Sequence, residues 1–158
     1  MSQSSGWSST GAWLTTLALV AGSTAPLMMY TPASAAPLSN GEVSGFIRAG
    51  MPAIRFRNQS KKNAPFERAL GEEYTFTANR GDELEFQVDP EDGSNLQAIL
   101  VLVSLPSGKQ VAFTDRSNFL KYKVPTAGQY KLLVLAKGTT RGRYTLFTEG
   151  IGQTAATP

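Results

Sequence analysis

The 158-residue sequence contains no cysteine and no histidine. Without cysteine the chain has no disulfide framework, no thiolate nucleophile and no zinc-ribbon or iron–sulfur ligands. Without histidine it lacks the base of a Ser-His-Asp or Cys-His pair and the commonest metal ligand. Charged residues make up only 17% of the chain, which excludes a disordered or coiled-coil protein. Composition alone therefore excludes most familiar active sites.

Charge is missing altogether from residues 1–35. This segment has a short apolar run over residues 12–22, then prolines, then Ala33-Ser34-Ala35. An apolar run followed by small residues at alternate positions predicts a secretory signal over 1–35, cleaved after Ala35. The run is shorter than the roughly 20 residues of a membrane-spanning helix. Because no lysine or arginine precedes the run, an uncleaved anchor stays open as the alternative.

Beyond the signal, apolar and polar residues alternate, and turns rich in glycine and proline separate the alternating runs. A period of two is typical of half-buried strands, and many short strands in succession favour a sandwich or barrel. The continuous apolar run 98–103 predicts a central strand covered on both faces. We therefore predict an all-β fold, an antiparallel β-sandwich of jelly-roll or Greek-key type, over residues 45–151. Residues 36–44 are expected to form a flexible arm, and residues 152–158 a disordered tail.

The turn at residues 125–128 bears on the topology. A simple hairpin through this turn, with its apolar faces aligned, would place Lys123 opposite Lys131. Like charges directly opposed across strands are destabilising. The sequence therefore favours a strand that switches sheets at this turn, as in a Greek key or jelly roll.

Charge is segregated along the chain. Residues 72–92 carry eight acidic and one basic side chain, and residues 109–143 carry eight basic and one acidic. One interpretation is that the two segments neutralise each other across strands. The other is a basic face that binds an acidic protein or a polyanionic envelope polymer. Aromatic residues are not interleaved with these basic ones, so nucleic acid is not expected as a partner. The basic candidates for partner binding are Arg141, Arg143, Lys137, Lys121 and Lys123.

Arg141 is the preferred contact residue, because glycines flank its loop and a guanidinium group matches a carboxylate. The alternative is a soluble hairpin tip without a binding role.

Carboxylates supply the only candidates for metal binding or catalysis. Asp89, Glu91 and Asp92 lie in a loop whose oxygen ligands suit calcium, but the loop fails the EF-hand spacing, so an ordinary acidic turn is the favoured interpretation. No other cofactor is expected.

Glu83 and Glu85 share one face of a strand but alternate with core residues, which marks them as solvent-facing rather than as a glycosidase pair. We therefore expect no enzyme activity.

Four segments together resemble the bacterial pre-peptidase C-terminal domain. They are Tyr74–Asp82 (YTFTANRGD), Leu105–Lys109 (LPSGK), Val124–Leu132 (VPTAGQYKL) and Gly142–Leu146 (GRYTL). The resemblance covers about residues 72–148 and implies a small, non-catalytic jelly-roll β-sandwich of the kind usually attached to secreted enzymes. Three further features are the segment Ile54–Arg57 (IRFR) before the Tyr74 strand, the turn Pro125–Tyr130 and a basic loop before the last strand. In these features the chain is similar to periplasmic inhibitors of lysozyme, particularly of the goose type, which show a related pattern on a stand-alone exported sandwich.

The residues and the resemblance together predict a bacterial protein that is periplasmic or extracellular. Its expected role is that of a non-catalytic binding module that contacts an envelope polymer or a protein through a basic face. The alternative function is inhibition of a goose-type lysozyme. In either case no stable membrane insertion is expected after the signal is removed.

Overall fold

The computed structural model describes residues 35–152. Apart from Ala35, the predicted signal lies outside the described residues, as do residues 153–158 of the predicted tail. The described part of the chain contains ten strands and no helix long and apolar enough to cross a membrane. The strands are β1 (Ala36–Pro37), β2 (Gly41–Ile47), β3 (Ala53–Arg57), β4 (Phe66–Ala78), β5 (Glu83–Pro90), β6 (Ala98–Ser104), β7 (Lys109–Thr114), β8 (Phe119–Lys123), β9 (Gly128–Ala136) and β10 (Gly142–Glu149).

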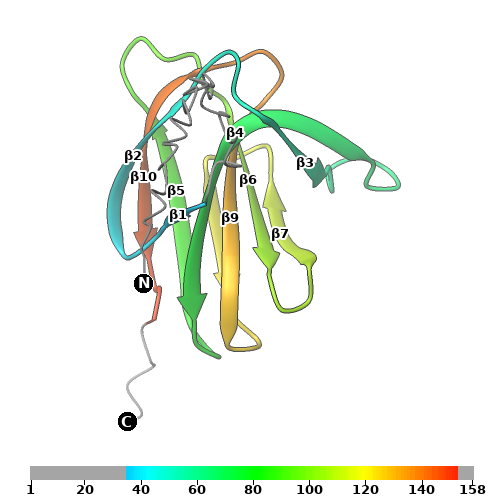
Figure 1. Ribbon diagram of the computed structural model, residues 1–158, viewed down its shortest axis with the longest axis vertical. Helices are drawn as coiled ribbons and strands as arrows, with labels where there is room; N and C mark the ends of the chain where they lie inside the picture. Colours follow the sequence, from blue (N-terminus) through cyan, green and yellow to red (C-terminus); the bar gives the residue numbers. More distant parts are fainter. Residues whose placement is uncertain (1–34, 153–158) are drawn as a thin grey trace, which may run out of the picture. The chain divides into compact units, whose positions relative to one another are not determined.

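These strands form two sheets, as the sequence predicts. The larger sheet has the order β1-β4-β9-β6-β7, with β3 paired to the first part of β4 (Figure 1). The smaller sheet has the order β2-β10-β5-β8. Every pairing except the short parallel contact of β1 with β4 is antiparallel. The predicted antiparallel β-sandwich is therefore confirmed.

The chain switches sheets at residues 125–128, as the charge argument predicts. β8 pairs with β5 in the smaller sheet, whereas β9 pairs with β4 and β6 in the larger one. In this arrangement Lys123 lies opposite Glu83, and Lys131 lies opposite Thr75 on one side and Val103 on the other. The two lysines that a simple hairpin would have opposed are thus on different sheets.

The main core fills the space between the two sheets. Its fully buried side chains come from both sheets and include Leu100 and Leu102 of β6, Phe86 of β5, and Tyr144 and Leu146 of β10. Side chains on successive strand residues point to opposite faces, so the same strands also present residues on the far side of the sheet. Within residues 35–152, a buried apolar cluster on that far side is found on the larger sheet alone.

This second cluster lies on the outer face of the larger sheet. It joins Val101 of β6 and Leu135 of β9, both fully buried, to Phe56 of β3. β6 is therefore covered on both faces, as the apolar run 98–103 predicts. The cover on the outer face is the β3–β4 hairpin.

Residues 36–44 are part of the sandwich, so the expectation of a loose arm is wrong. Ala36 and Pro37 pair in parallel with Tyr74 and Thr75 of β4, and Leu38 is buried in the main core. β2 begins at Gly41 and pairs along its whole length with β10. Ala36 and Pro37 show no alternating pattern in the sequence, because β1 is an edge contact of only these two residues. At the other end, Gly152 of the predicted tail donates its backbone N–H to Asp82 (3.0 Å).

Candidate functional site

The β3–β4 hairpin has one apolar side and one basic side. Pairing of β3 with β4 places Arg55 opposite Arg68 and Arg57 opposite Phe66. All four side chains are exposed, whereas Phe56, which points the other way, is buried in the outer cluster. We call the exposed surface formed by Arg55, Arg57, Phe66 and Arg68 the hairpin face.

The ring of Phe66 organises this face. The guanidinium carbon of Arg55 lies 3.8 Å from the centroid of the ring, and that of Arg57 lies 4.3 Å from it. A guanidinium at such a distance is attracted by the quadrupole of the ring. Half of the Phe66 surface nevertheless remains exposed, at 50%. The ring therefore restrains two arginines and still offers apolar area to a ligand.

The positive charge of the hairpin face is not compensated. Among the described residues, Arg55, Arg57 and Arg68 take part in no ion pair. Two like charges directly opposed across strands cost stability. Repulsion between the arginines therefore lowers the stability of the folded chain, and their guanidinium groups are free to bind an anion.

A hollow of about 530 Å³ adjoins the hairpin face. Arg55, Arg57 and Phe66 border it on one side, and Lys109 and Gln110 of β7 border it on the other. Lys109 is exposed and, within residues 35–152, also forms no ion pair. Three basic side chains, Arg55, Arg57 and Lys109, can therefore contact an anionic group in this hollow.

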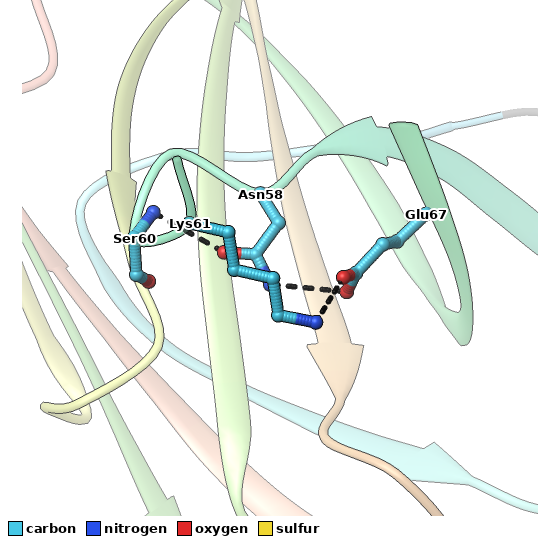
Figure 2. A network of polar contacts seen from close by, with 4 residues as sticks. All are labelled: Asn58, Ser60, Lys61 and Glu67. Atoms are coloured by element: carbon cyan, nitrogen blue, oxygen red, sulfur yellow. Dashed lines mark hydrogen bonds and ion pairs between the residues drawn. The ribbon is translucent and has the colours of Figure 1, made fainter. Parts of the chain in front are cut away.

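The turn that closes the hairpin is held by polar contacts (Figure 2). Asn58, itself buried, donates from Nδ2 to Glu67 Oε2 (3.0 Å) and accepts at Oδ1 from the backbone N–H of Ser60 (3.2 Å). Lys61 forms an ion pair with the same carboxylate of Glu67. The hydrogen bond from Lys61 is the main cause that lowers the pKa of Glu67. Glu67 is thus engaged with the turn and does not neutralise the arginines beside it.

Contacts with β7 fix the hairpin on the sheet. The backbone N–H of Arg57 donates to Gln110 Oε1 (3.0 Å), and Gln110 Nε2 donates to the carbonyl of Arg57 (2.9 Å). Beneath them the rings of Phe56 and Phe113 stack with centroids 6.2 Å apart. The side-chain amide of Gln110 thus satisfies both the N–H and the C=O of Arg57, as a neighbouring strand would do at this edge of β3. The arginines therefore project from a fixed backbone.

Two of the basic residues predicted from the sequence, Lys121 and Lys123, lie on β8 and pair with acidic residues of β5. Lys121 Nζ lies 2.6 Å from Glu85 Oε1 and 3.8 Å from Glu83 Oε2, and Lys123 Nζ lies 3.5 Å from Glu83 Oε1. The bond to Glu85 raises the pKa of Lys121. For these residues the cross-strand neutralisation considered above is the arrangement found.

The other three predicted residues lie in or after the loop before β10. Lys137 donates from Nζ to the carbonyl of Asp115 (3.0 Å). Arg141 is half-buried, its Nε is enclosed without a hydrogen-bond partner among the described residues, and its backbone N–H bonds Asn95 Oδ1 (2.9 Å). Arg143 is exposed, with its guanidinium carbon 4.8 Å from the ring centroid of Phe46. The structure does not bring these five basic residues together, and Arg141 is not the unrestrained tip that its flanking glycines suggest.

The acidic loop forms a turn. Asp89 accepts a hydrogen bond from Gln87 (2.8 Å), and the carbonyl of Glu91 accepts one from the backbone N–H of Ser94 (2.9 Å). Within residues 35–152, no group of three or more acidic side chains is placed to hold a metal ion. Asp89, Glu91 and Asp92 therefore do not form a ligand set in this structure.

The hairpin face was missed by the sequence reasoning, although part of its signal was visible. Arg55 and Arg57 alternate with Ile54 and Phe56, which already places both arginines on one exposed face. What the sequence does not reveal is the register that brings Arg68 opposite Arg55.

Comparisons with known proteins address the fold. No protein-family model and no curated protein matches this chain. Among solved structures, it is similar to the pre-peptidase C-terminal domain of a collagenase from Bacillus anthracis. That match has a TM-score of 0.51 and 18% identity, and it covers 75% of this chain and 97% of that domain. The fold resemblance inferred from the four sequence segments is confirmed.

Two further solved structures match this chain with lower TM-scores. One is PliG of Aeromonas hydrophila, a periplasmic inhibitor of g-type lysozyme, with a TM-score of 0.48, 11% identity, and coverage of 73% of this chain and 94% of that chain. The other represents carbohydrate-binding modules of the β-sandwich superfamily, with a TM-score of 0.32, 15% identity, and coverage of 72% and 57%.

Proposed function

We propose that this chain is an exported, non-catalytic β-sandwich module that binds an acidic polymer of the cell envelope through the hairpin face. The observation that carries the proposal is the uncompensated cluster of Arg55, Arg57 and Arg68 around the exposed ring of Phe66. Export is supported by the charge-free segment 1–35 that ends in Ala33-Ser34-Ala35.

The chemistry of the face selects the class of ligand. A guanidinium group presents two parallel N–H donors that match the two oxygens of a carboxylate. Arg55 and Arg68 lie opposite each other, so one anionic group between them relieves their mutual repulsion. The exposed part of Phe66, beside the two guanidinium groups that lie over its ring, offers apolar area to a sugar ring or a polymer backbone. A polymer of acidic sugars supplies both features in a repeating array.

The test is binding to a polymer of acidic sugars. Polygalacturonate is the probe, neutral dextran of similar length is the reference, and affinity is measured by calorimetry at low and at physiological salt. We expect binding to polygalacturonate alone, and weaker binding at the higher salt because exposed charges are screened. The double variant Arg55→Ala/Arg68→Ala should lose at least about tenfold in affinity, since hydrogen bonds to charged groups contribute about 1.5–3 kcal/mol each.

A matched control separates this face from the net charge of the protein. Lys121→Ala/Lys123→Ala removes the same charge from the smaller sheet, where both lysines are paired with acids. We expect this control to bind nearly as well as the wild type. Equal losses in the two double variants, or no binding of the wild type to polygalacturonate, would contradict the proposal.

Inhibition of a goose-type lysozyme is the second candidate, and one observation favours it. Arg143 is exposed beside the 38%-exposed ring of Phe46, so a cation and an aromatic ring are presented together near the start of β10. A lysozyme cleft contains catalytic carboxylates. The test is the loss of turbidity of a cell-wall suspension with goose-type lysozyme, in the presence of wild type or of Arg143→Ala. Inhibition that Arg143→Ala abolishes supports this candidate, and no inhibition at micromolar concentration retires it.

A further inference from the structure

A second polar site lies where the edges of the two sheets meet, around Glu72 of β4. Glu72 Oε2 accepts hydrogen bonds from the hydroxyls of Tyr144 (2.5 Å) and Tyr74 (3.2 Å) and from the backbone N–H of Phe46 (3.2 Å). The two hydroxyl oxygens are themselves 2.8 Å apart. Burial raises the pKa of Tyr74 to about 12 and raises that of Tyr144 as well, so both hydroxyls keep their protons, and these two protons serve the contacts among Tyr74, Tyr144 and Glu72.

This half-buried carboxylate has no counter-charge among the described residues. Its sequence neighbour Glu73 pairs with Lys131 (2.9 Å), and Glu85 pairs with Lys121 (2.6 Å), but Glu72 forms no ion pair with any residue of 35–152. All three of its hydrogen bonds go to Oε2, and none goes to Oε1. A partly buried anion is stabilised most by a nearby cation, and that cation is missing here.

A pocket of about 280 Å³ opens beside Glu72, and one of its walls is Ala36. Ala36 is the first residue of β1 and pairs with Tyr74, two residues along β4 from Glu72. It is also the residue that directly follows the predicted cleavage site after Ala35. The structure therefore places the predicted new terminus of the mature chain at the pocket that contains the uncompensated carboxylate.

We propose that signal removal completes this site: the α-ammonium group of Ala36 binds the carboxylate of Glu72. Hydrolysis of the Ala35–Ala36 peptide bond by an export peptidase consumes one water and leaves a carboxylate on Ala35 and an ammonium group on Ala36. Before cleavage the same nitrogen is a neutral amide, so the cation is created only by maturation. The inference rests on the export included in the proposed function, and it does not depend on what the hairpin face binds.

None of the other described groups that line the pocket can act as the cation that pairs with Glu72. Glu73 also lines the pocket, but its carboxylate is engaged by Lys131. Tyr74 and Tyr144 remain neutral donors to Glu72. The remaining lining residues are Val43, Ser44 and Met51, which carry no charge.

The test uses the full chain, exported by a bacterial host and recovered in its mature form. Intact mass identifies the terminus, and the pKa of the terminal amine is measured by NMR from the pH dependence of the ¹³C-labelled methyl group of Ala36. An ordinary terminal amine titrates at about 7.7–8.0. With Glu72 as its partner we expect a pKa higher by at least about one unit, because a nearby opposite charge favours the charged form.

Two variants locate the partner. Glu72→Gln keeps an oxygen acceptor for the tyrosine hydroxyls but removes the charge, and it should return the amine to its ordinary pKa. Glu73→Gln, the matched control on the same strand, should leave the raised value nearly unchanged.

Each result decides the proposal. An amine with an ordinary pKa in the wild type overturns it, even if Glu72→Gln does not fold, and a shift lost in Glu73→Gln but not in Glu72→Gln overturns the assignment to Glu72. A mature terminus other than Ala36 overturns both this proposal and the predicted cleavage. Cleavage at Ala36 with an unshifted amine overturns this proposal alone, and binding of polygalacturonate is judged separately.

Discussion

Leu100 and Val101 are consecutive residues of β6, both fully buried, and they face different cores: Leu100 packs between the sheets and Val101 packs under the β3–β4 hairpin. The larger sheet thus has an apolar cluster on each face. Truncation of a large side chain should therefore be costly on either face. Leu100→Ala and Leu135→Ala, one from each cluster, are each expected to lower the free energy of unfolding by about 2–5 kcal/mol, measured by urea denaturation.

The control for this pair is Leu105→Ala, because Leu105 is 38% exposed. Its free energy of unfolding should change by no more than about 0.5 kcal/mol. If Leu135→Ala were as mild as Leu105→Ala while Leu100→Ala remained costly, the hairpin would not pack on the outer face of the sheet as described.

Gly128 opens β9 with a φ of +154°, and a Cβ added there would lie 2.9 Å from Cγ of Pro106. Both the backbone conformation and the close approach disfavour any larger residue. Gly128→Val is therefore expected to lower the thermal midpoint clearly more than Ala127→Val does, since Ala127 is exposed in the turn. Equal losses in these two neighbouring variants would show that the turn does not require glycine.

Alkaline pH should destabilise the protein through Tyr74. Its pKa is raised, chiefly by burial, to about 12, whereas the same tyrosine in the unfolded chain titrates near 10. Because the folded state holds the proton more tightly, this contribution to stability is fully present below about pH 10 and is lost as the pH rises toward 12. The measurement is the urea midpoint at pH 8, 10 and 11, in wild type and in Tyr74→Phe. The wild type should show the steeper loss, and parallel curves would contradict the prediction.

Because Arg55 and Arg68 repel each other but both contribute to the hairpin face, we expect a trade-off: removing the repulsion should raise stability and weaken ligand binding. Arg68→Glu places a carboxylate opposite Arg55 and replaces a repulsive cross-strand pair by an attractive one. We expect the free energy of unfolding to rise by about 0.2–1 kcal/mol at low salt, while affinity for polygalacturonate falls. Urea denaturation and calorimetry on the same sample measure the two effects.

Lys123→Glu is the matched variant on the smaller sheet. It makes the same change in net charge but places a carboxylate opposite Glu83, so it should lower stability by a similar amount and leave binding nearly unchanged. If both substitutions moved stability in the same direction, net charge rather than cross-strand register would be the cause.

The sequence predicts the sandwich because its strands alternate regularly and because repulsion between Lys123 and Lys131 argues against a hairpin at residues 125–128. It does not predict β1, since a pairing of two residues leaves no pattern. Nor does it predict that β4 starts at Phe66, because Glu72 and Glu73 interrupt the alternation and the partners of its first part lie on a different strand. For the site, alternation places Arg55 and Arg57 on one face, but only the cross-strand register adds Arg68.

β4 is one continuous strand with two successive partners. Its first part pairs with β3 and carries the hairpin face, and its second part forms the eight residue pairs from Gly71–Leu135 to Ala78–Gly128 with β9. A long polymer held at the hairpin face would pull on the protein whenever the envelope is deformed. Tension directed along β4 would reach all eight pairs at once as shear, so the ladder would resist it collectively, whereas force on an isolated surface loop would open contacts one by one.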